Sequence, residues 1–252
     1  MKLIHNFKSP NFNERKSQNI ELIIIHYTAL KNASESIKYL CSKKNKVSSH
    51  YLISRKGQIF SLVSDKNRAW HAGKSYWKGK KDLNSISIGI ELDYFPDNDK
   101  KFTSKLNESL IALVIQLVKK YKILPENILG HSDIAPYRKI DPGKYFPWSI
   151  LENKKLAKKI QPTVYNEINL KIIKEWSKQN KFKSTKTKIL FMLNNIGYDT
   201  SLALKNNIYF NKLIDAYSSR FRYYRNYYYN KKNIFSVIEQ HFFNIMLTKI
   251  KK

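Results

Sequence analysis

The stretch Ile23-Ile24-Ile25-His26-Tyr27-Thr28 decides the fold. A run of β-branched residues favours a strand buried on both faces, as in the central sheet of an α/β protein. This run ends in polar side chains, and α/β proteins usually carry their chemistry at the edge where parallel strands end. We therefore predict a central buried strand that places His26 at a functional edge of the sheet.

Two later segments carry residue types that would complete a metal site with His26. His131 follows residues 125–130, which have the pattern of a second short strand, and Asp141 stands before a Pro-Gly turn. Two imidazoles and one carboxylate leave the fourth tetrahedral position open, as in a catalytic rather than a structural zinc site. Spacing alone leaves an alternative, because a histidine at a strand end is more often an ordinary hydrogen-bonding residue.

Residues 85–92 alternate as a half-buried strand, with four apolar side chains on one face. Glu91 therefore points to the other face. An exposed strand carboxylate usually meets only solvent, but one aimed at an open metal site is a candidate general base. Residues 104–121 follow with an amphipathic pattern that predicts a helix covering the sheet.

Residues 47–53 and 58–63 predict a β-hairpin around Gly57. His50 and Tyr51 are neighbours on its first strand, so only one of them can face the metal site. A glycine-punctuated aromatic loop follows, and aromatic faces pack well on sugars and peptides, so Trp70 and His71 are candidate substrate-binding residues. The alternative is a locally buried cluster within this loop.

The chain has 252 residues, 42% of them hydrophobic, which suits one sizeable α/β domain and a small companion. No apolar run is long enough to span a bilayer. The N-terminus lacks the apolar core of a secretory signal, which predicts a cytoplasmic protein unless export follows a route without a recognisable signal. The single cysteine, Cys41, is expected to be a small core residue.

The net charge of +28 raises the possibility of nucleic-acid binding, because phosphate recognition is mainly a matter of positive field. Three alternatives account for the same charge without nucleic acid. Biased residue usage would enrich lysine, many lysines form a solvated face, and the anionic peptides of a cell wall would also be attracted. On balance nucleic acid is not expected as a partner.

The composition changes after Trp148 toward a polar stretch interrupted by Pro162. We predict a first domain over residues 1–160, a linker over 161–184 and a helical domain over 185–252. Three apolar stripes at helical spacing indicate a three-helix module, with Gly197 ending its first helix. Residues 223–229 interleave Tyr and Arg, a pattern that suits packing but also stacking on nucleobases.

Six blocks of the sequence carry a family resemblance in their order along the chain. The blocks are His26-Tyr27-Thr28, Ser49-His50-Tyr51-Leu52-Ile53, Ala69-Trp70-His71-Ala72-Gly73, Ser87-Ile88-Gly89-Ile90-Glu91, Gly130-His131-Ser132-Asp133-Ile134-Ala135-Pro136 and Arg138-Lys139-Ile140-Asp141-Pro142-Gly143. Over roughly residues 20–150 they resemble the zinc-dependent N-acetylmuramoyl-L-alanine amidases (amidase type 2), and they are most similar to the two-domain AmiD-like branch.

The resemblance implies an α/β fold with a mixed central sheet flanked by helices, the amidase or peptidoglycan-recognition fold, with a helical peptidoglycan-binding-like module at the C-terminus. It also implies a Zn²⁺ ion held by His26, His131 and Asp141. Glu91 would be the general base, and Lys139 would stabilise the negative charge that develops on the substrate oxygen.

By the same resemblance, Tyr51 corresponds to the pocket tyrosine of the family, while His50 is either a substrate-binding residue or a structural hydrogen-bonding one. The implied substrate is the amide between N-acetylmuramic acid and L-alanine, in peptidoglycan, in muropeptides or in both. A non-catalytic peptidoglycan-recognition protein is the second hypothesis, and a basic nucleic-acid-binding protein is the third. Retention of all three ligand candidates together with Glu91 and Lys139 favours the enzyme.

Overall fold

The computed structural model describes residues 2–16, 18–99, 101–160, 167–221 and 234–250. The chain divides into two compact units. The first unit comprises Met1–Tyr76 and Lys80–Lys158, and the second comprises Trp77–Gly79 and Lys159–Lys252. No helix within the described residues is both long enough and apolar enough to cross a membrane.

A six-stranded sheet forms the centre of the first unit, with the strand order β1-β5-β4-β7-β3-β8. Its strands are β1 (Leu3–Ile4), β3 (Leu22–Tyr27), β4 (Tyr51–Ile53), β5 (Ile59–Ser61), β7 (Ser87–Leu92) and β8 (Ile128–Gly130). Only the β4–β5 pair is antiparallel within this sheet. The mixed sheet predicted from the sequence is therefore confirmed. A separate antiparallel ribbon joins β2 (Phe12–Glu14) to β6 (Asn67–Ala69).

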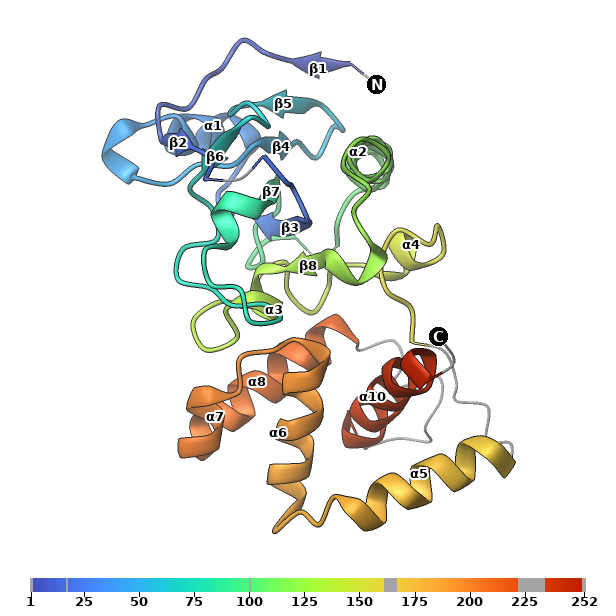
Figure 1. The fold of residues 1–252 in the computed structure, drawn as a ribbon. Helices are drawn as coiled ribbons and strands as arrows, with labels where there is room; N and C mark the ends of the chain where they lie inside the picture. Colours follow the sequence, from blue (N-terminus) through green and yellow to red (C-terminus); the bar gives the residue numbers. More distant parts are fainter. Residues whose placement is uncertain (1, 17, 100, 161–166, 222–233, 251–252) are drawn as a thin grey trace. The chain divides into compact units, whose positions relative to one another are not determined.

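Helices cover both faces of this sheet, and Figure 1 shows α1 and α2 on opposite sides of its strands. Helix α2 (Ser104–Tyr121) starts at Thr103, whose side chain caps it. Its leucines pack on the alternate side chains that include Ile23, Ile25 and Ile90. Helix α1 (Ala33–Leu40) packs on the other face, against Leu52. Because strand side chains alternate, His26 and Glu91 share the α1 face rather than the α2 face.

Short elements connect these layers in the first unit. They are the 3₁₀ turns η1 (Lys43–Asn45), η2 (Leu83–Ile86) and η3 (Pro125–Asn127), and the helices α3 (His131–Ile134) and α4 (Ser149–Glu152).

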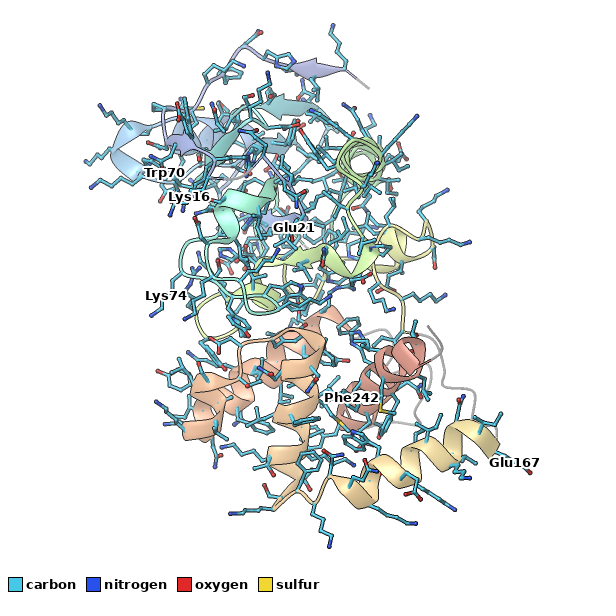
Figure 2. All side chains as sticks on the ribbon, in the orientation of Figure 1. Lys16, Glu21, Trp70, Lys74, Glu167 and Phe242 are labelled. Atoms are coloured by element: carbon cyan, nitrogen blue, oxygen red, sulfur yellow. The ribbon has the colours of Figure 1, made fainter. Side chains whose placement is uncertain are left out.

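The second unit is helical throughout its described regular structure. Its helices are α5 (Glu167–Gln179), α6 (Thr185–Ile196), α7 (Ser201–Lys205), α8 (Asn207–Arg220) and α10 (Ile234–Ile250). Gly197 ends α6 at a φ of 137°, as predicted, since glycine adopts positive φ without a Cβ clash. Phe242, labelled in Figure 2, lies among aromatic rings from α5 and α6, including Trp176 and Phe191.

Two features of the second unit differ from the sequence analysis. The segment predicted as a linker, residues 161–184, contains helix α5. That helix has its own apolar stripe, and Trp176 joins the aromatic cluster, so the many charged residues between apolar positions mark a solvated helix face rather than a linker. Residues 185–252 contain α6, α7, α8 and α10 among the described residues, more than the predicted three helices. The Tyr-rich residues 223–229 lie outside the described residues.

The half-buried carboxylate of Asp65 ties the hairpin to α2 in the first unit. Asp65 accepts hydrogen bonds from the Tyr51 and Tyr121 hydroxyls, both at 2.7 Å, and from Lys120 Nζ at 3.0 Å. Burial alone would raise the pKa of Asp65, but these donors outweigh burial and the pKa is lowered. The charged form of Asp65 therefore stabilises the fold.

Asp65→Asn should lower the free energy of unfolding at neutral pH by about 1–3 kcal/mol, because the three donors lose a charged acceptor. The native pKa lies below the unfolded one, so this stabilisation is present above the ordinary carboxyl pKa and is lost as the pH falls. Urea unfolding at about pH 7 and about pH 3 should therefore show a smaller difference from the parent protein at the lower pH. Exposed Asp97→Asn is the control, and an equal loss at both pH values would contradict the assignment.

Candidate metal centre

The candidate metal centre lies where three neighbouring parallel strands end (Figure 1). Strand β3 pairs with β8 so that Ile25 stands opposite Gly130, which places His26 and His131 at the same edge of the sheet. Strand β7 pairs on the other side, with Glu91 opposite His26. The carboxyl edge of the sheet thus gathers these three side chains from distant parts of the chain.

Asp141 reaches the same edge on the loop that follows α3. The Ser132 N–H donates to the Asp141 carbonyl oxygen at 2.9 Å, which folds this loop back toward His131. Gly130 allows the close approach, because a Cβ there would lie 2.6 Å from Pro142 Cδ. A backbone hydrogen bond and the close packing of Pro142 on Gly130 therefore hold this loop near His131.

Three ligand atoms converge at this point. His26 Nδ1 and His131 Nδ1 lie 3.0 Å apart, and each lies 3.0 Å from Asp141 Oδ2. All three residues are buried, and they form a group able to hold a metal ion. The ligands of a tetrahedral zinc, with bonds of about 2.0–2.1 Å, stand about 3.3 Å apart. The observed spacing is close to that value, so the residues present fit such an ion.

The electrostatics of the cluster also suit a cation. Burial, followed by the proximity of His131, lowers the pKa of His26 to about 4, so its imidazole is neutral at pH 7 and keeps a free lone pair. Burial would raise the pKa of Asp141, but hydrogen bonds with His131 and His26 lower it well below its usual range. Neutral imidazoles and a charged carboxylate are the forms that bind metal.

Glu91 stands beside this cluster with one oxygen unused. Its Oε2 atom is buried without a hydrogen-bond partner among the described residues. Burial, with a contribution from the Asp141 charge, raises the pKa of Glu91 to about 8, and the charge of Lys139 opposes that shift. A carboxylate with a buried, unsatisfied oxygen and a raised pKa is a typical proton-transfer group. Lys139 itself is exposed on the loop before Asp141.

Tyr51 lies elsewhere, which corrects the expectation of a pocket tyrosine. It stands opposite Ile90 in the β4–β7 pair, so its ring points into the core beneath α2, on the face away from His26 and Glu91. Its hydroxyl is used by Asp65. The register of β4 against β7 is set by long-range pairing, and residue type alone does not reveal it.

His50 lies in the hydrogen-bonded interior, the environment expected for the second of its two predicted roles. It is fully buried, its Nδ1 accepts the Gly89 N–H at 3.0 Å, and its Nε2 lies 2.9 Å from Arg15 Nη2. Trp70 is half-buried at the end of β6, and its indole donates to Asn13 on β2 at 2.6 Å. The indole therefore braces the β2–β6 ribbon.

His71 contacts the metal cluster from inside the fold rather than lining an open groove. Only 8% of its surface is exposed, and its Nδ1 lies 3.1 Å from His26 Nε2. The ring occupies the space above Gly89, where a Cβ would lie 2.5 Å from His71 Cγ. The alternative of a locally buried loop therefore describes this residue better than substrate binding.

Three polar residues that the sequence analysis did not single out support the centre. Arg15 is buried and donates to the carbonyl oxygens of Asn84, Ser85 and Ser87. Asn84 Oδ1 in turn accepts the backbone N–H groups of His71 and Ala72. Arg138 donates to the Ala72 and Lys74 carbonyl oxygens.

No spacing rule points to these residues, because each acts on backbone groups far away in sequence. The polar segment around Arg15 has no helical or strand periodicity that would predict a buried side chain, and Asn84 resembles an ordinary turn residue.

A mostly parallel sheet with a buried His-His-Asp cluster and a carboxylate at its carboxyl edge defines an α/β protein with a candidate metal site. The family model described as N-acetylmuramoyl-L-alanine amidase (Amidase_2) matches residues 16–144, about half of the chain. The chain belongs to this family.

Two curated relatives carry names that agree with this family assignment. The chain is 40% identical over 150 residues to the N-acetylmuramoyl-L-alanine amidase AmiD of Escherichia coli, covering 52% of this chain and 52% of the relative. It is 38% identical over 160 residues to the 1,6-anhydro-N-acetylmuramyl-L-alanine amidase AmpD of Haemophilus influenzae, covering 56% and 86%. The match thus spans about half the length of the first relative.

A solved structure extends the likeness to both units. The complex of E. coli AmiD with the substrate anhydro-N-acetylmuramic acid-L-Ala-D-gamma-Glu-L-Lys superposes with a TM-score of 0.69 and 28% identity, covering 96% of this chain and 98% of that one. The helical second unit therefore belongs to the shared fold, although the family model matches residues of the first unit and the 77–79 segment only.

Gly89→Ala should lower the free energy of unfolding by about 1–3 kcal/mol, because the new methyl group overlaps the His71 ring. His71→Ala in the same chain removes the obstacle, so the double variant should lose less stability than the sum of the single variants. Thermal or urea unfolding of the three variants measures this coupling. Strictly additive losses would show that the ring does not occupy the space above Gly89.

Proposed function

We propose that the protein is a zinc-dependent N-acetylmuramoyl-L-alanine amidase, which hydrolyses the amide between N-acetylmuramic acid and L-alanine in peptidoglycan, in muropeptides or in both. The observation that carries the proposal is the set of three converging ligand atoms, 3.0 Å apart, in a chain of this family. His26, His131 and Asp141 would hold the ion. The ligand set suits zinc, and it leaves room for solvent and substrate.

The relatives support the choice of substrate class. The solved E. coli AmiD holds an anhydro-N-acetylmuramic acid tripeptide, and the H. influenzae AmpD is named for the 1,6-anhydro-N-acetylmuramyl-L-alanine bond. Both names place the scissile bond between a muramic acid derivative and L-alanine. We extend that bond to this chain, with anhydro-muropeptides as the first substrate to test.

A bound zinc ion would acidify water and polarise the substrate carbonyl group. Glu91 supplies the proton transfer. A bound cation beside it would favour its charged form, and its Oε2 atom, which has no partner among the described residues, can then take a proton from the attacking water. The water oxygen bonds to the lactyl carbonyl carbon, and the C–N bond then breaks. Glu91 returns the proton to the departing alanine nitrogen, so the products are a free carboxyl group and a free amine.

Lys139 has the charge and the location for a second role. It stands on the exposed loop before Asp141, and its charge acts on both Glu91 and His26. Negative charge develops on the carbonyl oxygen as water adds to the carbon. An ammonium group near that oxygen stabilises the transition state more than the neutral substrate, which is the condition for raising the rate.

We further propose that the helical C-terminal part, predicted from residue 185 onward, serves as a peptidoglycan-binding module. The structural likeness to E. coli AmiD covers 96% of this chain and therefore includes this part. The excess of positive charge in the whole chain, +28, would favour an anionic polymer such as a peptide-bearing cell wall. A nucleic-acid partner is supported only by this charge and by the Tyr/Arg pattern of residues 223–229, and we do not propose it.

His26→Ala and His131→Ala should each abolish stoichiometric zinc binding, because two remaining ligands do not hold the ion tightly. Elemental analysis of the purified proteins gives the zinc content directly. His5→Ala alters an exposed histidine and should retain the metal. Full zinc content in both ligand variants would refute the proposed site.

Glu91→Gln should keep the zinc and reduce turnover of an anhydro-muropeptide by about 10²- to 10⁴-fold, the usual contribution of a general base. Mass spectrometry of the released peptide measures the rate, with chelated protein as the blank. Unchanged turnover would exclude Glu91 as the base. Absence of turnover in the zinc-loaded parent protein, together with retained muropeptide binding, would favour the non-catalytic recognition protein instead.

A further inference from the structure

A buried imidazole lies directly behind one of the proposed zinc ligands. His26 presents Nδ1 to the ligand cluster, and its other nitrogen, Nε2, lies 3.1 Å from His71 Nδ1. The two rings meet edge to face, with centroids 5.2 Å apart and planes at 80°. This arrangement brings His26 Nε2 and His71 Nδ1 within hydrogen-bonding distance.

The direction of each hydrogen bond follows from the proposed site. When His26 Nδ1 donates its lone pair to a metal ion, the proton of the neutral ring is on Nε2. His71 Nδ1 must then accept the hydrogen bond from His26 Nε2–H, which places the His71 proton on its own Nε2. That atom lies 3.3 Å from Ser87 Oγ, and the Ser87 hydroxyl donates to the Leu83 carbonyl oxygen at 2.6 Å. The chain of donors and acceptors ends in a group that only accepts.

We propose that His71 is a positioning residue that holds His26 in its metal-binding tautomer and orientation, through a relay from His26 to His71, Ser87 and the Leu83 carbonyl group. The inference rests on the proposed metal site and goes beyond it. His71 does not touch the ion or the substrate. It acts through His26 by fixing which nitrogen offers a lone pair.

Ala72, the next residue in the chain, orients the second histidine ligand, His131. His131 Nε2 lies 3.2 Å from the Ala72 carbonyl oxygen, so that its proton too is directed away from the metal-facing Nδ1. Asn84 Oδ1 accepts the N–H groups of His71 and Ala72, at 3.1 and 2.8 Å, and fixes both at once. The His71–Ala72 dipeptide thus orients both imidazole ligands from one rigid support.

Packing alone does not account for an imidazole at this position. A buried polar ring is stabilised only when its nitrogen atoms are hydrogen-bonded, and an apolar side chain would fill the same space without that requirement. The sequence also makes room for the ring, because Gly89 lacks the Cβ that would overlap it. His50 offers the internal comparison: it is equally buried, and its ring is 5.5 Å from that of His71, but its nitrogen atoms contact Gly89, Arg15 and Asn67 rather than a ligand.

Zinc affinity of the full-length variants, measured by competition with a chelating dye, tests the relay. His71→Leu keeps the approximate volume but removes the acceptor, and should weaken zinc binding by about 10- to 100-fold. His71→Asn places an amide oxygen near the former Nδ1 and should recover most of the affinity. His50→Leu removes an equally buried imidazole without touching a ligand, and the folded protein should bind zinc nearly as the parent does.

Two results of this titration would overturn the proposal: parental affinity in His71→Leu, or an equal loss in His50→Leu, which would mean that general packing is responsible. Failure of the parent protein to bind zinc would instead reject the proposed function, so the two failures are distinguishable.

A direct measurement on the parent protein decides the matter even where His71→Leu does not fold. Nitrogen-15 NMR of the zinc-loaded protein reports which nitrogen of each imidazole carries a proton. The relay requires a protonated Nε2 and an unprotonated Nδ1 in His71. A His71 protonated at Nδ1 would overturn the proposal regardless of the enzymatic activity.

Discussion

The close approach of three lone-pair atoms at the sheet edge is the constraint on which the rest of the site depends. His26 Nδ1, His131 Nδ1 and Asp141 Oδ2 lie 3.0 Å from one another in a buried position. The two Nδ1 atoms carry at most one proton each, which is too few to satisfy all three contacts as hydrogen bonds. A cation resolves this conflict, since it accepts all three lone pairs at once. The surrounding fold must hold the three atoms together until the cation binds.

The two faces of the sheet differ in composition, and this difference keeps the three ligand atoms together. The face under α2 is apolar and supplies the core, through residues such as Ile25 and Ile90. The opposite face of the same strands carries His26, Glu91 and the space above Gly89 that His71 fills. Beyond His71, Arg15 donates to the Asn84 carbonyl oxygen, and the Asn84 side chain accepts the His71 N–H group. The cost of burying these polar groups is offset by their hydrogen bonds, except at Glu91, whose Oε2 atom has no partner among the described residues.

Sequence reasoning succeeded where a local pattern determines the answer. The β-branched run before His26 and the alternation around Glu91 depend on residues next to one another, and strand alternation fixes the face of each. It failed for Tyr51, because the face that a short strand presents to its neighbour depends on a register set by distant residues. It missed Arg15, whose partners Asn84 and Ser87 lie about seventy positions away. It took α5 for a linker because charged residues stand between the apolar positions of that helix.

The placement of Asp141 and Lys139 on one loop has a consequence for how the site assembles. His26 and His131 are held by strand ends, whereas Asp141 is carried by the loop after α3 and anchored there by the Ser132 N–H group. Lys139 lies two positions before Asp141 on that loop and is exposed. A metal ion that binds Asp141 would therefore also restrict where the Lys139 ammonium can lie. Ordering the Asp141 loop and positioning the charge that we propose to stabilise the oxyanion would then be a single event, which is the preorganisation that catalysis requires.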